Sequence, residues 1–376
     1  MTEPVATVDT LIIGAGPVGM TLQLALAAGG RQALLLDRRA PAALQADPRA
    51  LALSHGAREL LEQLGGWPTR AATPIETIHI SQRGGFGRTL IDRAEHDLPA
   101  LGYVVRYRDL ASALAARLAP DALRAEVEIL AITPDRDGVT VALREQGVSR
   151  RLRARTLVHA EGTPWDDPST LLGDYEQHAV ICEVTPTPGH GRRAWERFTP
   201  DGPLALLPLG DEYSIVFTLP PAKADAVMAL DDKAFIAALE TQFQRGLRFA
   251  KPGPRNRFPL ALRMRETLVR EREVWVGNSA QTLHPVSGQG FNLGLRDAWQ
   301  LAEVLLDGDD LGRYPGLRRL DRRGGALFTD QVVRAFSNDF PPLRAARGLG
   351  LLALDLCPAA RHFVARRMIW GARAWP

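Results

Sequence analysis

Residues 8–37 read VDTLIIGAGPVGMTLQLALAAGGRQALLLD, and they carry the most informative pattern in the chain. The apolar, β-branched segment 8–13 predicts a buried strand, and apolar side chains at helical spacing between 18 and 26 predict a helix after it. The run 33–36 predicts a second buried strand. Strand, glycine-rich turn, helix and strand in this order form the building unit of an open parallel sheet with crossover helices.

The turn between the first strand and the helix has the spacing of a dinucleotide fingerprint. Gly14 suits the tight turn, Gly16 suits close approach of a pyrophosphate, and Gly19 suits packing of the helix on the strand. Asp37 ends the second strand, where an acid binds ribose hydroxyls. A lone glycine pattern is weak evidence, but here every neighbouring element is in order. We predict a bound adenine dinucleotide, and Asp37 favours FAD or NAD over NADP.

A second glycine-rich stretch lies far along the chain. Residues 274–297 read VWVGNSAQTLHPVSGQGFNLGLRD, which predicts a short buried strand, a loop and then a helix. Gly288 and Gly290 allow close approach just before the helix, whose free N–H groups and dipole favour a negative partner. A flavin pyrimidine edge becomes negative on reduction and is one such partner. A plain turn between a core strand and a core helix is the alternative interpretation.

The composition is that of an ordinary globular protein, with 45% hydrophobic and 24% charged residues among 376. The net charge of +3 is uneven, because residues 311–376 hold 12 Arg against 4 Asp, with no Lys or Glu. A basic tail on an acidic body favours an acidic partner surface, either anionic lipid or another protein. Nucleic acid is not expected, since no nucleic-acid-binding motif occurs.

The two cysteines, Cys182 and Cys357, are far apart and form no metal-ligand cluster, so no metal site is expected. The N-terminus has no basic n-region, and no run of about 18 apolar residues occurs. We therefore expect a cytoplasmic protein.

Between the two glycine-rich stretches, the pattern predicts further elements. Residues 47–64 are predicted as one helix, which begins near Arg49, and short alternating stretches at 75–98 predict a small antiparallel sheet. A helix begins near Arg108. Either arginine could bind a phosphate or the flavin region, or simply lie at a solvated helix start. Segments 127–132 and 139–143 predict a hairpin.

The middle of the chain changes to strands without crossover helices. These are predicted at 179–185, 194–198, 204–209 and 213–219, followed by one helix at 231–245. We predict an α/β fold: a Rossmann-like domain with an inserted antiparallel-sheet substrate domain and a C-terminal helical segment. The predicted boundaries are 1–70, 100–165 and 263–310 for the nucleotide domain, 71–99 and 166–262 for the substrate domain, and 311–376 for the basic helical segment.

Four motifs together carry a resemblance over nearly the whole chain: the glycine fingerprint, DPRALALS at 47–54, FTPDGPLALLPL at 198–209, and the 277–297 stretch. The set resembles the ubiquinone-biosynthesis flavin hydroxylases, which are FAD monooxygenases with the para-hydroxybenzoate hydroxylase fold. Residues 277–285 are most similar to the 2-polyprenyl-6-methoxyphenol hydroxylase branch.

The resemblance implies roles for individual residues. It places the pyrophosphate at the fingerprint glycines, the adenosine ribose at Asp37, and the flavin near the following residues: Arg49, Arg108, Asn278 at the ribitol, and Pro285, Gly288, Gly290 and Asn292 along the ring. The chain departs from the pattern twice. Asn278 stands where most relatives carry Asp but keeps an acceptor. Glu161 stands where relatives carry Asp, in a motif associated with the flavin and the nicotinamide.

The implied reaction is hydroxylation of a polyprenylated phenol. NADH or NADPH reduces the FAD, O2 adds to give a flavin hydroperoxide, and its distal oxygen attacks the ring. His284 is the titratable group nearest the expected flavin, and it serves either as a proton relay or as a support of the Pro285 turn. Three rival functions stay open: a flavin reductase of isoprenoid lipids, a hydroxylase of a soluble aromatic acid, and a flavin-binding scaffold subunit.

The end of the chain predicts a pair of basic amphipathic helices between residues 343 and 370. Such a pair suits an anionic membrane surface, which would place the protein peripherally at the inner membrane, or other ubiquinone-biosynthesis proteins. Packing on the nucleotide domain as a cover is the alternative interpretation.

Overall fold

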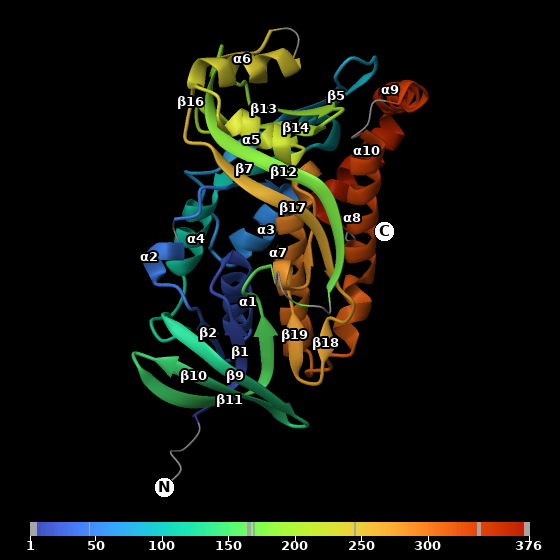
Figure 1. The fold of residues 1–376 in the computed structure, drawn as a ribbon. Helices are drawn as coiled ribbons and strands as arrows, with labels where there is room; N and C mark the ends of the chain where they lie inside the picture. Colours follow the sequence, from blue (N-terminus) through green and yellow to red (C-terminus); the bar gives the residue numbers. More distant parts are fainter. Residues whose placement is uncertain are drawn as a thin grey trace.

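The computed structural model describes residues 6–44, 46–163, 167, 170–243, 246–336 and 340–371. Residues 1–5, at the start of the predicted nucleotide domain, and residues 372–376, at the end of the predicted basic helical segment, lie outside the described residues. Two large sheets are stacked end to end, and the last helices run along one side of both (Figure 1). The predicted α/β fold class is confirmed.

The first sheet contains the N-terminal strand and is mainly parallel. Its order is β18 (Val269–Arg270), β19 (Glu273–Trp275), β11 (Val148–His159), β1 (Ala6–Ile13), β2 (Ala33–Leu36) and β8 (Leu123–Arg124). The predicted hairpin extends it as β9 (Val127–Asp135) and β10 (Gly138–Glu145), antiparallel to β11. Because β11, β1, β2 and β19 run parallel, their carboxyl ends meet at one edge of the sheet, where both glycine-rich stretches begin.

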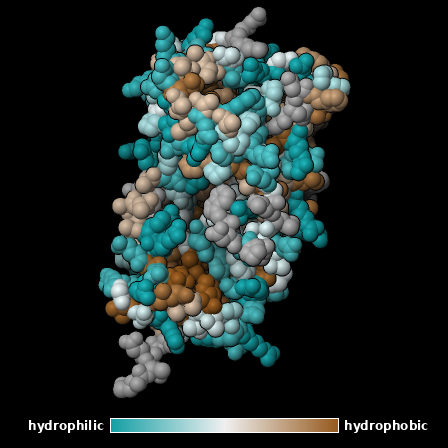
Figure 2. Space-filling model, in the orientation of Figure 1, coloured by the Kyte–Doolittle hydropathy of each residue, from teal (hydrophilic) through white to brown (hydrophobic). Residues whose placement is uncertain are grey.

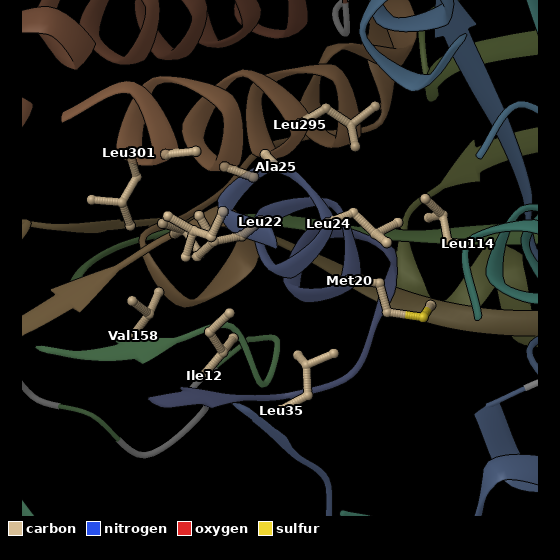
Figure 3. Packing of buried hydrophobic residues seen from close by; sticks show 14 of the residues in the cluster. Ile12, Met20, Leu22, Leu24, Ala25, Leu35, Leu114, Val158, Leu295 and Leu301 are labelled. Carbon is tan, nitrogen blue, oxygen red and sulfur yellow. The ribbon is translucent and has the colours of Figure 1, made fainter. Parts of the chain in front are cut away.

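The helix α1 (Pro17–Ala28) is buried between this sheet and α7 (Gln289–Leu306) (Figure 3). Ile12, Leu35 and Val158 of the sheet face Leu22 on one side, and Leu295 and Leu301 of α7 close the other side. The helix is apolar all round because it has a partner on both sides. This packing brings the two glycine-rich stretches, which begin at Gly14 and Gly277, to one place in the fold.

A small antiparallel sheet lies beside that edge and corrects one prediction. Its strands are β3 (Ala50–Ser54), β7 (Gly102–Arg106) and β4 (Thr73–Ile75). The predicted helix over 47–64 is therefore wrong in its first half, and the helix α3 (His55–Gln63) begins only after the Ser54 side chain accepts the Ala57 N–H. Five residues of β3 pair with β7, so tertiary pairing overrides the helix propensity of Ala and Leu.

The second sheet is mostly antiparallel, as predicted. Its order is β20 (Gln281–Thr282), β17 (Asn256–Arg265), β12 (Thr170–Thr187), β15 (Glu212–Leu219), β14 (Gly202–Leu209), β13 (Arg193–Thr199), β5 (Thr77–Gln82) and β6 (Arg88–Asp92), with β16 (Arg248–Pro252) beside β12. The helices α6 (Asp232–Phe243) and α5 (Pro221–Met228) cover one face, and α5 is an element that the sequence reading missed. The domain boundaries themselves stay a prediction.

The opposite face of the second sheet, here called the inner face, is turned toward the first domain. Its apolar side chains pack on β3 and β7 near Ala50 and Val104, and on the loop after β20 through Val286. Shorter elements around it are α2 (Pro41–Leu44), η1 (Arg93–His96), α4 (Tyr107–Ala115), η2 (Gly277–Ser279) and η3 (Val286–Gly288).

The C-terminal segment forms α8 (Arg313–Phe336), α9 (Pro341–Leu356) and α10 (Pro358–Trp370). Much of its positive charge points inward: Arg318 and Arg322 are buried, Arg347 donates to the carbonyls of Ala335 and Phe336, and Arg361 binds Glu95. The prediction of a basic exposed surface is thus corrected for these arginines. Among the described helices, none is long and apolar enough alone to cross a bilayer, and α9 with α10 reaches that length only as a pair bent by 96°.

Candidate functional site

The first glycine-rich turn joins β1 to α1, and its three glycines meet different surroundings. A Cβ on Gly14 would lie 2.5 Å from the Ala160 carbonyl carbon, and one on Gly19 would lie 2.0 Å from the Gly14 oxygen. These two glycines are therefore required by packing within the chain. A Cβ on Gly16 would meet only the Tyr107 hydroxyl, at 3.3 Å. The side of the turn at Gly16 is open, which fits a pyrophosphate at the N-terminus of α1.

Asp37 lies beside this turn, as the sequence predicted. Its Oδ2 accepts the Ala15 N–H at 2.8 Å, and its Oδ1 accepts the Arg39 backbone N–H at 2.8 Å. Burial raises the pKa of the Asp37 carboxyl, but these bonds and the Arg39 guanidinium outweigh burial and leave the pKa below its ordinary value. The carboxylate thus stays ionised and able to accept ribose hydroxyls. Arg39, which the sequence reading missed, would share that surface.

The second turn begins at Gly277 and packs directly on the first helix. Gly277 has a φ of +58°, and a Cβ there would lie 3.2 Å from a methyl group of Val18. Its N–H donates to Asp297 Oδ2 at 3.0 Å, which fixes the start of η2. Asn278 follows, is exposed, and its amide bonds none of the described residues. That amide is available to a ligand lying between the two turns.

Asn292 fixes the loop 285–288 against β3. Its Oδ1 accepts the Ser54 N–H at 2.9 Å, and its Nδ2 donates to the carbonyls of Ala52 and Gly288 at 3.0 and 2.8 Å. Gly288 has a φ of +62°, and a Cβ there would lie 3.0 Å from the Ala52 methyl. The side chain of Asn292 therefore acts on the chain itself, whereas Pro285, Gly288 and Gly290 leave backbone open at the N-terminus of α7.

His284 is buried and held in one neutral tautomer. The Val286 N–H donates to its Nδ1 at 3.1 Å, so its Nε2–H donates to Gln177 Oε1 at 3.2 Å. Loss of solvation lowers the pKa of His284 to about 3. A histidine that stays neutral across the physiological range is a poor proton relay. The geometry favours the other interpretation, in which His284 supports the turn at Pro285.

Arg49 and Arg108 lie on the Tyr107 side of the site. The Arg49 guanidinium binds Asp47 and lies 5.5 Å from the Tyr107 ring centroid. Arg108 is exposed and lines a cavity of about 380 Å³ together with Asp47, Arg106, Glu183 and Glu212. This cavity is lined by Arg106 and Arg108 on either side of Tyr107 in sequence, whereas the Tyr107 hydroxyl itself lies next to Gly16.

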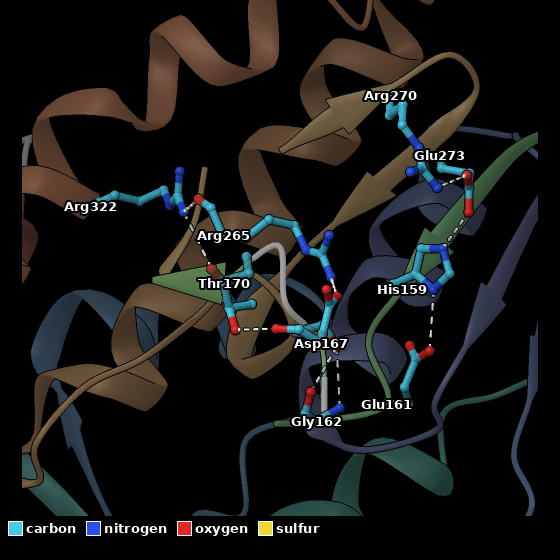
Figure 4. A network of polar contacts seen from close by, with 11 residues as sticks. His159, Glu161, Gly162, Asp167, Thr170, Arg265, Arg270, Glu273 and Arg322 are labelled. Atoms are coloured by element: carbon cyan, nitrogen blue, oxygen red, sulfur yellow. Dashed lines mark hydrogen bonds and ion pairs between the residues drawn. The ribbon is translucent and has the colours of Figure 1, made fainter. Parts of the chain in front are cut away.

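A buried histidine that the sequence reading missed links β11 to β19, the strand that leads into the second glycine-rich stretch (Figure 4). His159, at the end of β11, donates to Glu273 at 2.9 Å and to Glu161 at 3.2 Å, and it stacks on Trp275 with ring centroids 4.7 Å apart. Burial lowers the pKa of His159, but the two carboxylates outweigh burial and raise it to about 9. The departure at Glu161 thus has a structural use, because its carboxylate reaches this histidine.

The segment after Glu161 is bonded to η2. The Gly162 N–H donates to Ser279 Oγ at 3.3 Å, and that hydroxyl donates to the Gly162 carbonyl at 3.0 Å. The position of Asn278 next to Ser279 is therefore tied to the His159 network. The sequence signal that could have identified His159 was its place directly after the buried apolar residues Leu157 and Val158 at the end of β11.

We expect His159→Gln to reduce stability in a pH-dependent way. Because the pKa of His159 is raised on folding, its contribution is fully present below about pH 6.5 and is lost as the pH rises through about 9. The difference in free energy of unfolding between wild type and variant should change by up to about 1.4 kcal/mol per pH unit in this window. Urea unfolding at pH 6, 7.5 and 9.5 measures it, and a difference that is constant with pH would contradict a charged His159.

Comparison with known proteins decides the family. A family model described as an FAD binding domain matches residues 7–308. The chain belongs to this FAD-binding family. It is 35% identical to ubiquinone hydroxylase UbiL of Rhodospirillum rubrum, over 96% of this chain and 89% of that protein. It is 31% identical to 3-demethoxyubiquinol 3-hydroxylase of Escherichia coli, over 92% of this chain and 94% of that protein.

Solved structures show the same fold. The p-nitrophenol 4-monooxygenase PnpA of Pseudomonas putida matches with a TM-score of 0.78 at 17% identity, covering 98% of this chain and all of that one. PqsL of Pseudomonas aeruginosa, a probable FAD-dependent monooxygenase, matches with a TM-score of 0.75 at 20% identity, over 92% and 99% of the two chains. The chain is an FAD-dependent monooxygenase, with NAD(P)H as the reductant of its family.

The described residues fit FAD. Along an extended FAD, the ionised carboxylate of Asp37 would meet the adenosine ribose and the open backbone at Gly16 would meet the pyrophosphate. The side-chain amide of Asn278 would meet the ribitol. When bound, the flavin supplies electron transfer to O2 and delivery of oxygen, which no side chain can supply. The N-termini of α1 and α7 would hold the flavin between them, and burial keeps His284 neutral at the start of the loop 285–288.

Proposed function

We propose that this chain hydroxylates the aromatic ring of a polyprenylated phenol, of the methoxyphenol type, in ubiquinone biosynthesis, with NADH or NADPH as reductant and O2 as oxygen donor. The observation that carries the proposal is the 35% identity to a ubiquinone hydroxylase over 96% of the chain. The relatives in Escherichia coli and in Danio rerio carry names of the same pathway.

The geometry supports an apolar aromatic substrate. The inner face packs on the loop 285–288 through Phe198 and Val286, and α8 contributes Val333 and Phe336 to the same cluster. Phe198 stacks on Phe336 with ring centroids 3.9 Å apart. An apolar wall excludes water from reactive flavin chemistry and suits an isoprenoid-bearing ring better than an aromatic acid.

Steady-state NADH oxidation tests the substrate class. A methoxyphenol carrying one farnesyl chain should stimulate NADH consumption and yield a product with one additional oxygen atom. A soluble hydroxybenzoate should give neither effect, because the cluster around Phe198 and Val286 is apolar. Stimulation by hydroxybenzoate alone would reject the proposal. A saturated isoprenoid product would indicate a reductase, and no reduction of FAD under any condition would indicate a scaffold.

We also propose that α9 and α10 rest on an anionic membrane surface from which the substrate is taken, at the inner membrane. Large apolar side chains are exposed there: Phe340, Leu349, Leu352, Leu356 and Phe363. Figure 2 shows brown and tan residues gathered over the end of the molecule where Figure 1 places α9. Arg366 is exposed beside them, and apolar side chains with a cationic neighbour favour an interfacial position.

The double substitution Leu349→Ser with Leu356→Ser tests this surface. Leu349 is 59% and Leu356 is 73% exposed, so the folded state should be little affected. Removing two leucines from a lipid interface is expected to weaken binding to vesicles of phosphatidylglycerol and phosphatidylcholine by at least about tenfold. Co-sedimentation measures it, with Leu130→Ser on β9 as the control. Sedimentation of the double variant at the wild-type level would exclude this surface.

A further inference from the structure

The inner face carries the carboxyl group of Glu196, which takes no part in the FAD site. On β13, Trp195 and Arg197 point toward α6, since Trp195 meets Phe243 and the Arg197 Nε donates to the Gln242 carbonyl. Side chains alternate along a strand, so Ala194, Glu196 and Phe198 lie on the inner face. Glu196 is therefore turned toward the first domain.

The two strand neighbours of Glu196 on the inner face pack on β3 and on the loop 285–288. Ala194 packs in one cluster with Ala50 of β3, and Phe198 packs in another with Val286. Glu196 lies between them on the same strand. β3 and the loop 285–288 are the two segments that Asn292 joins, so Glu196 faces the region where the aromatic ring of a substrate would meet the flavin.

The surroundings of Glu196 are apolar and leave its acid group unpaired. The sheet register sets Ala205 on one side of Glu196 and Ile80 on the other. The Oε1 atom is buried and has no hydrogen-bond partner among the described residues, although the residue as a whole keeps some accessible surface. A buried acceptor without a partner has lost the hydrogen bond that water would give it, so a ligand that donates a hydrogen bond there would bind favourably.

Other carboxylates on the inner face differ in this respect. Glu183 accepts two bonds from the Arg106 guanidinium, and Glu212 lies 3.8 Å from the same group. No described cation reaches Glu196. Burial raises the pKa of Glu196 to about 8, so at neutral pH it is mainly a carboxylic acid that can donate and accept one hydrogen bond.

We propose that Glu196 hydrogen-bonds the ring hydroxyl of the phenolic substrate and thereby orients the ring against the loop 285–288. The inference rests on the proposed function and adds the group that selects a phenol. The unpaired Oε1 acceptor in an apolar wall discriminates between a phenol and its ether, because only the phenol hydroxyl can donate a hydrogen bond to that atom.

The test compares a farnesylated methoxyphenol with its methyl ether, in which the ring hydroxyl is capped. Binding to the FAD-loaded protein is measured by isothermal titration calorimetry, independently of turnover. Wild type should bind the phenol about 10- to 100-fold more tightly than the ether. Glu196→Leu should bind both alike, whereas Glu196→Gln, which keeps an acceptor of the same size, should retain most of the preference. Glu266→Leu, at an exposed position outside the site, should behave as wild type.

The outcomes separate the two proposals. If wild type turns over the phenol but Glu196→Leu keeps its preference for phenol over ether, the role of Glu196 is overturned and the proposed function stands. If wild type binds neither compound, both are overturned. Should Glu196→Leu fold poorly, equal binding of phenol and ether by Glu196→Gln would equally overturn the assignment of Glu196 as an acceptor.

Discussion

Replacing Arg318 with methionine is expected to lower the free energy of unfolding by about 3–5 kcal/mol. Arg318 is fully buried, and its Nε lies 2.6 Å from Asp297 Oδ1. Asp297 is also fully buried, and it accepts the Gly277 N–H. Without the Arg318 guanidinium, the buried Asp297 carboxylate accepts only from the neutral Gly277 N–H and Gln281 amide. Leaving a buried charge without its partner is strongly destabilising.

The Arg318 substitution should weaken FAD binding as well as lower stability. Asp297 fixes Gly277, and Gly277 begins the turn that carries Asn278, so FAD affinity should fall together with the urea midpoint. Arg313→Met on the same helix is the matched control, because Arg313 is half exposed and pairs with Asp307 at the surface. A surface pair contributes about 0–1 kcal/mol. Equal urea midpoints for the two variants at saturating FAD would contradict the buried network.

Gly16→Val is expected to remove FAD while leaving the fold intact. A Cβ at Gly16 meets only the Tyr107 hydroxyl, so valine can be accommodated, but its methyl groups fill the space next to the α1 N-terminus. The dissociation constant for FAD should rise at least about 100-fold, which corresponds to roughly 2.7 kcal/mol. Fluorescence titration of the apoprotein measures it, and circular dichroism checks the fold.

The control for this variant is Gly316→Val on α8, where an added Cβ meets nothing within 4 Å. It should bind FAD as wild type does. If Gly16→Val retains the wild-type dissociation constant, the pyrophosphate does not lie at this turn, and the assignment of Gly16 fails.

The sequence predicted the parts of the fold that local pattern determines. The fingerprint defined β1, α1 and β2 because strand period, glycine spacing and helix period agree within 30 residues. The strands β12 to β15 of the second sheet were found for the same reason, whereas β16, β17 and β20 were not predicted. The segment 50–54 failed because Ala and Leu favour a helix locally, and only the pairing with β7, some 50 residues away, makes it a strand.

Side-chain direction was harder to predict than secondary structure. Composition shows that the last 66 residues are basic, but it does not show that Arg318 and Arg322 point into the core toward Asp297 and Gln281. His159 and Glu196 were missed because their roles come from neighbours on other strands. Glu196 stands between Ala194 and Phe198 on one strand face, and His159 follows the apolar Leu157 and Val158, so each is a polar residue next to a short apolar pattern.

Oxygen transfer in a single turnover tests the central claim most directly. The FAD-loaded protein is reduced with NADH under anaerobic conditions, mixed with a farnesylated methoxyphenol, and pulsed with isotopically labelled O2. The account predicts that one labelled oxygen atom appears on the aromatic ring. Unchanged phenol with labelled hydrogen peroxide as the sole oxygen product would contradict it.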